Sequence, residues 1–221
     1  LDNSFTGSFV EQDGILEGAG YFGSPVLAEF FMPPTGPAFN EDGTPNTGAI
    51  GANIFQPGGT NIFNPVYVQN NDIDRKRNTR VLNNTNLNIQ IMENLSFNTN
   101  FALDYILTEE KYYDNPFYGD AQDVRGLVND IDNRNFNYVW RNTLNYVFQP
   151  IENHTFDVRL ISESQKNQAR YFDAWGQGIA ADGLTNLSTT ATPQGALGTT
   201  EDWSVQSFTG LVNYDFNDKV I

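Results

Sequence analysis

A single histidine limits the catalytic chemistry that this chain could perform. Any Ser-His-Asp triad or histidine-ligated metal site would have to include His154, because both arrangements need an imidazole. His154 lies in an expected tight turn, where we expect it to be exposed to solvent. Paired carboxylates could do acid–base chemistry instead, but Asp130 with Asp132 and Glu109 with Glu110 fall in expected polar loops. Such loops lack the apolar surroundings that raise the pKa of an acid, so the sequence predicts no enzyme.

Two segments carry oxygen ligands at the alternating spacing of calcium-binding loops. Residues 40–43 are Asn-Glu-Asp-Gly, and residues 72–74 are Asp-Ile-Asp. A full calcium site needs further ligands, including a bidentate glutamate, and Asp-Gly is also a common turn sequence. The chain contains no cysteine, which excludes thiolate metal sites and disulfides. We therefore expect a turn at the Asp-Gly of the first segment, with no metal and no cofactor.

The charge of the chain argues against nucleic acid as a partner. The formal net charge is −15, whereas binding to phosphates requires clustered lysine and arginine. The one basic cluster, Arg75–Arg77, is short and is preceded by Asp72 and Asp74. The sequence therefore predicts no nucleic-acid binding.

A regular alternation of apolar and polar residues predicts the β-strands that position these residues. From Leu95 to Leu107 the odd positions are mostly apolar and the even positions mostly polar. A period of two over about thirteen residues predicts a β-strand with one apolar face. At about 3.3 Å per residue and a tilt near 45°, such a strand crosses a bilayer core of about 25 Å. Strands of soluble proteins are usually about half as long.

The same alternation recurs along the chain. The other alternating segments are 81–91, 136–149, 156–163 and 207–216, and Val220–Ile221 would begin a further strand. Short turns are expected at Met92–Asn94, which would place Ile91 opposite Leu95, at Pro150–Asn153 and at Asn217–Lys219. Long connections are expected at about 109–134 and 168–202. Because short and long connections alternate, all the long ones lie at one end, which is the plan of an outer-membrane β-barrel.

Residues 1–76 differ from residues 77–221, which we expect to form consecutive transmembrane β-hairpins. Phe5 and Phe9 could end one strand, and a Gly- and Pro-rich segment without sustained periodicity follows. We interpret this segment as a long extracellular loop with a possible short helix at 24–31, capped by Ser24 with Pro25 in the first turn.

Three hypotheses compete at this stage. The first is an all-β fold in which five to six antiparallel strands form part of a transmembrane barrel with long extracellular loops. The alternative is a soluble all-β sandwich binding module, because sandwiches also alternate. A third is an outer-membrane enzyme on a small closed barrel, which the lack of a catalytic constellation disfavours. Strand length and the one-sided loops favour the first hypothesis.

Several segments, in order along the chain, resemble the SusC/RagA-type TonB-dependent outer-membrane transporters. They are Met32–Gly43, Asn64-Pro65-Val66, the hairpin Arg77–Leu107, Trp203-Ser204, Phe208–Tyr214 and Asp218-Lys219. The resemblance implies an internal slice of a barrel of about 22 strands, without the plug and the energy-coupling box. It further implies nutrient import of an oligosaccharide or peptide across the outer membrane of a Gram-negative bacterium. The implied partners are a SusD-like surface lipoprotein, the TonB energy-coupling complex and outer-membrane lipid.

Two sets of residues are candidates for contact with a solute. Charged residues on the polar strand faces would face the lumen, where they could line a solute path or pair with one another: Asp104, Arg141, Asp157, Arg159 and Glu163. Aromatic residues in the expected extracellular loops could stack on a ligand or a partner, or could pack within the loops: Tyr112, Tyr113, Phe117, Tyr118 and Trp175.

Overall fold

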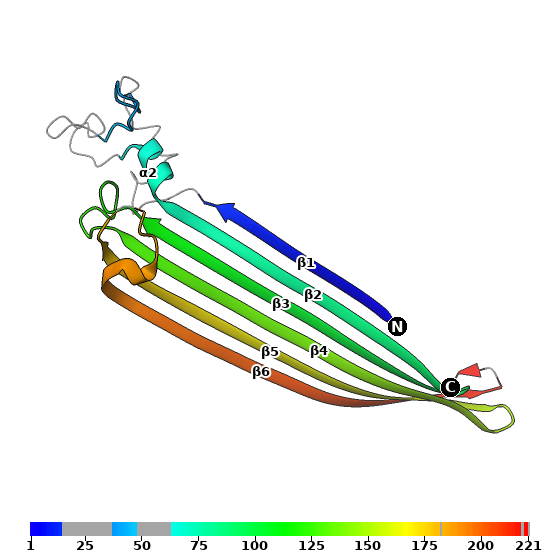
Figure 1. Ribbon diagram of the computed structural model, residues 1–221. Helices are drawn as coiled ribbons and strands as arrows, with labels where there is room; N and C mark the ends of the chain where they lie inside the picture. The colour runs from blue at the N-terminus through cyan, green and yellow to red at the C-terminus, as the bar shows by residue number, and fades with distance from the viewer. Residues whose placement is uncertain (15–36, 48–62, 182, 218, 221) are drawn as a thin grey trace.

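A single antiparallel sheet dominates the molecule (Figure 1). The computed structural model describes residues 1–14, 37–47, 63–181, 183–217 and 219–220. The seven strands lie side by side in their order along the chain. They are β1 (Asp2–Asp13), β2 (Ile73–Met92), β3 (Leu95–Asp114), β4 (Leu127–Ile151), β5 (His154–Ile179), β6 (Thr190–Phe216) and β7 (Lys219–Val220). The predicted all-β antiparallel fold is confirmed.

The pairing register confirms the faces that alternation predicted. Phe97 of β3 lies opposite Ile89 of β2 and Leu144 of β4, so three apolar side chains share one face. The predicted pairing of Ile91 with Leu95 is wrong, because Met92 takes the place opposite Leu95. The register shifts between Gln90 and Met92, and such a bulge accommodates one extra residue without changing the faces of the strand above it.

The strands are longer than the alternation indicated. β3, β4, β5 and β6 contain 20, 25, 26 and 27 residues. The connection predicted at 109–134 is therefore only 115–126, and the one predicted at 168–202 is only 180–189. At Glu109-Glu110-Lys111 charged residues occupy both faces, so the hydrophobic period ends there although the backbone pairing of β3 continues to Asp114.

The connections differ in length at the two ends of the sheet, as predicted. The tight turns after β2, β4 and β6 lie at one end, here called the turn end (Figure 1). Asn153 and Asn217 have φ values of 65° and 53° in these turns, a conformation that asparagine tolerates better than most residues. The longer connections and the helix α2 lie at the opposite end, here called the loop end (Figure 1).

The helix α2 (Pro65–Asn71) was not predicted as an element. Its start follows from local chemistry: Asn64 is the N-cap, its Oδ1 accepts a hydrogen bond from the backbone N–H of Val66 at 3.0 Å, and Pro65 occupies the first turn. A short 3-10 helix, η2 (Leu187–Thr189), precedes β6. The helix predicted at 24–31 lies outside the described residues. No helix in the described ranges is long and apolar enough to cross a membrane.

Buried side chains are few and gather at the loop end. One cluster joins Tyr113, Val128 and Ile179 from β3, β4 and β5, and a second joins Val68 of α2 with Tyr118. Along the rest of the sheet, large apolar side chains remain exposed, including Trp140 at 49% and Phe208 at 77%. Within the described part of the chain, the core thus fixes the loop end and leaves the apolar face of the sheet uncovered.

Candidate functional site

The sheet has two chemically different faces. The apolar face carries residues that lie in register across the five strands β2 to β6, and the polar face carries the residues that alternate with them. The apolar face contains Ile89, Leu95, Phe97, Phe101, Leu103, Tyr105, Leu107, Phe136, Tyr138, Trp140, Leu144, Tyr146, Phe148, Phe156, Val158, Leu160, Phe208, Val212 and Tyr214. No second layer of described residues packs on this face, so it is suited to contact with an apolar medium.

Aromatic rings line the turn end of the apolar face. Ring centroids are 5.1 Å apart for Tyr146 and Phe148, 5.3 Å for Phe148 and Phe156, and 4.9 Å for Phe156 and Tyr214. These distances lie in the range of favourable aromatic pairs. The rings thus form a continuous row across β4, β5 and β6.

His154 extends this aromatic row, contrary to our prediction of an exposed turn residue. It is the half-buried first residue of β5, with its ring centroid 4.9 Å from that of Phe216. Its Nδ1 lies 2.6 Å from the hydroxyl oxygen of Tyr214, at hydrogen-bond distance. The sequence could have predicted this placement, because His154 is two positions before Phe156, and residues two positions apart in a strand lie on the same face.

The polar face brings the predicted lumen-facing charges together as ion pairs. Arg141 Nε donates to Glu163 Oε2 at 2.7 Å across β4 and β5. Arg159 donates to Asp157 at 2.8 Å along β5. Asp104 accepts from Arg80 at 2.8 Å, a partner that the sequence analysis missed although Arg80 occupies an even, polar-face position of β2. All five predicted residues share the polar face, and four of them pair with one another.

Asparagine amides form cross-strand hydrogen bonds elsewhere on the polar face. Asn98 Nδ2 donates to Asn86 Oδ1 at 2.6 Å, Asn100 to Asn84 at 2.7 Å, and Asn167 to Asn135 at 2.8 Å. These neutral cross-strand bonds stabilise strand pairing while leaving the face wettable. Ion pairs and amide bonds thus connect neighbouring strands along this face.

The loop-end aromatics fall into a buried and an exposed group. Tyr113 is only 1% exposed beside Val128, and Tyr118 packs edge-on against Phe63 and Tyr67, with ring centroids 5.2 and 5.0 Å away. Phe117 and Trp175 are 56% and 36% exposed, and Tyr112 is half-buried. A role in ligand contact remains a prediction for these five residues, and Phe117 and Trp175 offer the most accessible rings of the set.

Two buried asparagines, which sequence analysis did not single out, hold the loop end together. The side-chain amide of Asn64 donates to the carbonyl oxygens of Ala38 and Asn46 at 2.8 and 2.9 Å, and its backbone N–H donates to Tyr118 Oη at 2.7 Å. Asn115 donates through its backbone N–H and its side chain to Asp72 Oδ1 at 2.8 and 2.6 Å. These bonds tie the segment 37–47 and α2 to the β3–β4 connection.

The last residue of β3, Asp114, has a partly buried carboxyl at the loop end. Burial, together with the nearby charges of Asp72 and Asp120, raises the pKa of Asp114 to about 6 from its ordinary value of 3.8. Within the described ranges, no group of His, Cys, Asp and Glu residues has the geometry to hold a metal ion. At the first predicted calcium-like segment, Asp42 instead accepts from the backbone N–H and the hydroxyl of Thr44 at 2.9 and 2.6 Å, as in a turn.

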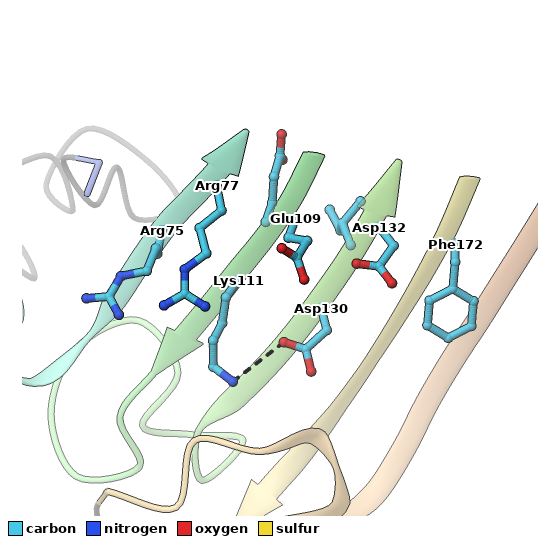
Figure 2. Close-up of a pocket in the computed structure, with 9 residues that line it drawn as sticks. Arg75, Arg77, Glu109, Lys111, Asp130, Asp132 and Phe172 are labelled. Atoms are coloured by element: carbon cyan, nitrogen blue, oxygen red, sulfur yellow. Dashed lines mark ion pairs between the residues drawn. The ribbon is translucent and has the colours of Figure 1, made fainter. Parts of the chain in front are cut away.

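A belt of charges crosses the apolar side of the sheet toward the loop end (Figure 2). Arg75, Arg77, Glu109, Lys111, Asp130, Asp132 and Phe172 line a hollow of about 400 Å³ there. The basic cluster of the sequence is divided between the faces, because Arg75 and Arg77 pair with Asp13 and Glu11 of β1 at 2.7 and 2.6 Å whereas Lys76 pairs with Glu110 on the polar face. Most of the belt is thus internally neutralised.

No family model and no curated protein matches this chain. Solved structures with a similar fold include the RagAB peptide transporter, with 18% sequence identity and a TM-score of 0.66 over 98% of this chain. The RagAB peptide importer is similar in its closed-closed state (17% identity, TM-score 0.66, 97% of this chain) and in its open-open state (18%, 0.65, 97%). The chain spans 24% of the length of each of these chains. At this identity the likeness shows a shared fold.

Proposed function

We propose that this chain forms part of the wall and outer rim of an outer-membrane nutrient-import receptor. The observation that carries the proposal is the two-faced sheet: one face is mainly apolar on β3, on β4 and on the turn-end part of β5 and β6, the other carries cross-strand amide bonds and ion pairs, and the longer connections share one end. A transmembrane barrel requires this combination, because its strands meet lipid on one side and water or a plug on the other.

The height of the apolar face supports a membrane span. On β4 it runs from Phe136 to Phe148, which at about 3.3 Å per residue and a tilt near 45° corresponds to roughly 28 Å. The apolar band of outer-membrane barrels is about 25 Å tall and is bordered by aromatic girdles. The aromatic row at the turn end supplies one such girdle, and Tyr138 and Phe136 supply the other. In this orientation the loop end is extracellular.

Import is supported by the kind of proteins that share the fold, which are chains of a peptide transporter and importer. We propose a peptide as the substrate, with an oligosaccharide as the alternative class. A SusD-like surface lipoprotein would cover the loop end, and the TonB complex would supply energy through parts of the protein that this chain does not include. The proposal includes no catalytic step.

The soluble sandwich is disfavoured by the same geometry. A sandwich needs a second sheet against its apolar face, and strands of 25 to 27 residues exceed the usual length of soluble strands several-fold.

Membrane extraction and growth together test the proposed function. The full-length protein should remain in the outer-membrane fraction until detergent is added. A strain that lacks it should lose growth on a peptide mixture, or on an oligosaccharide mixture, as the sole carbon source. Collapse of the proton-motive force should abolish uptake in the wild type. Recovery of the protein in buffer, or unchanged growth on both mixtures, would contradict the proposal.

The exposed loop-end aromatics test the proposed rim. Phe117→Ala and Trp175→Ala should each lower uptake severalfold at unchanged surface level, because these rings are accessible to a substrate or a lid. Leu184→Ala is the control, since Leu184 is a loop-end residue without a ring whose exposure is close to that of Trp175. Equal uptake by all three variants would remove the two aromatics from the functional surface.

A further inference from the structure

Two arginines lie directly opposite each other on the apolar side of the sheet. Arg134 of β4 is paired in register with Arg170 of β5, and both follow the alternation that places Phe136 and Leu160 on the apolar face. Like charges directly opposite on neighbouring strands destabilise a sheet. A pair of this kind therefore indicates a counter-charge that is supplied from elsewhere.

The protein itself supplies little of that counter-charge. Arg134 and Arg170 line a hollow of about 210 Å³ with Asp132 and Phe172. Arg134 Nη2 forms a long ion pair of 3.7 Å with Asp132, beyond hydrogen-bond distance, and no ion pair involves Arg170 among the described residues. The arginines of the neighbouring charged belt differ, because Arg75 and Arg77 have short bonds to β1 carboxylates.

The height of the pair on the sheet identifies the partner. The pairing row through Arg134 and Arg170 contains Leu107 on β3 and Thr200 on β6. It lies two residues, or roughly 5 Å along the membrane normal, beyond Phe136, the last aromatic ring of β4 on that face. On β3 and β4 this is the depth at which the apolar residues end and the charged belt begins, where lipid head groups meet a barrel wall; on β5 the same face is already polar from Ser162 onward.

We propose that Arg134 and Arg170 bind the phosphate of an anionic lipid head group of the outer leaflet. Two guanidinium groups on adjacent strands can each donate to phosphate oxygens, which neutralises the like-charge pair and anchors the lipid beside the barrel. Phe172 provides an apolar wall next to the site. This inference rests on the proposed membrane orientation, and it adds a specific lipid site that import alone does not require.

The test uses the purified full-length protein in phosphatidylcholine nanodiscs. The probes are lipid A with its phosphates, the same lipid A after enzymatic dephosphorylation, and inorganic phosphate, each scored by native mass spectrometry and by the thermal unfolding midpoint. Phosphorylated lipid A should bind and raise the midpoint, whereas the other two probes should not. Arg134→Gln and Arg170→Gln should each weaken its binding roughly tenfold, the order of magnitude that a charge-assisted hydrogen bond contributes.

Control variants separate this site from general charge and from the proposed function. Arg141→Gln removes a cation from the opposite face of β4 and should leave lipid binding unchanged, and the conservative Arg134→Lys should retain more binding than Arg134→Gln. Equal binding of the dephosphorylated lipid, equal stabilisation by inorganic phosphate, or unchanged binding in both glutamine variants would each overturn the lipid site. Failure of the membrane assignment would be recognised separately, because the wild-type protein would then not enter nanodiscs.

Discussion

An arginine placed on each face of β3 at the same depth provides a sharp test of the two-faced sheet. Leu103 lies on the apolar face between Asn83 and Tyr138, and the next residue toward the turn end, Ala102, lies on the polar face between Asn84 and Val139. Both side chains are half-buried, and neither makes a polar bond that the substitution would remove. Leu103→Arg and Ala102→Arg therefore differ almost entirely in the face that receives the charge.

The magnitude follows from the depth of Leu103. The apolar face of β3 runs from Leu95 to Leu107, so its midpoint is Phe101 and Leu103 lies roughly 5 Å away along the membrane normal. An arginine at the midplane costs about 2–4 kcal/mol, and the cost falls toward the interfaces. We expect Leu103→Arg to cost about 2–3 kcal/mol. Ala102→Arg should cost less than about 1 kcal/mol, because the polar face is hydrated and Asp104 lies nearby on the same face.

The assay is equilibrium unfolding of the full-length protein in lipid vesicles, monitored by tryptophan fluorescence at several guanidinium concentrations. A larger loss of unfolding free energy for Leu103→Arg than for Ala102→Arg is the expected result. If the two variants lose the same free energy, or if Ala102→Arg loses more, the assignment of faces is wrong.

Three further predictions concern the loop end and the turn end. Tyr118→Phe removes the acceptor of the buried Asn64 N–H and should speed amide exchange at Asn64, with a local cost of about 1–3 kcal/mol. The folded-state pKa of Asp114 is raised to about 6. The stability that its protonated carboxyl contributes to the folded loop end is therefore fully present below pH 3.8 and is lost as the pH rises through 6. The protection factors of amides near Asp114, which are corrected for the base-catalysed rise of the intrinsic exchange rate with pH, should therefore fall over that interval in the wild type and not in Asp114→Asn. Tyr214→Phe removes the hydroxyl that lies at hydrogen-bond distance from His154. It should lower the free energy of unfolding by about 0.5–1.5 kcal/mol, measured by the equilibrium unfolding in lipid vesicles used for the β3 variants.

Alternation alone was sufficient to predict the class of fold and most of the faces. Residues such as Phe97 and Leu144 lie where a period of two places them, because the backbone geometry of a strand fixes side-chain direction. The same reasoning failed at Glu109–Lys111, where paired strands continue although both faces are charged. Hydrophobic periodicity reports contact with an apolar medium, and these strands extend beyond the segment that needs such contact.

The loop end was least predictable because long-range hydrogen bonds determine it. Asn64 is fully buried by contacts with segments 18, 26 and 54 residues away, and no local pattern marks an asparagine for that role. Tyr113 and Tyr118 were grouped with the loop aromatics on residue type, yet their packing separates them from Phe117 and Trp175. The ion pairs of the polar face were predictable in part, since alternation placed Arg141 and Glu163 on one face and the register then made them neighbours.

Cysteine labelling of the full-length protein in intact cells tests the membrane-spanning orientation most directly. The chain contains no cysteine, so single substitutions at exposed positions give an unambiguous signal. With a membrane-impermeant maleimide, Asp123→Cys and Ser188→Cys at the loop end should be labelled in intact cells. Glu93→Cys and Glu152→Cys at the turn end should be labelled only after the outer membrane is permeabilised. Labelling of the turn end in intact cells, or no labelling of the loop end, would contradict the account.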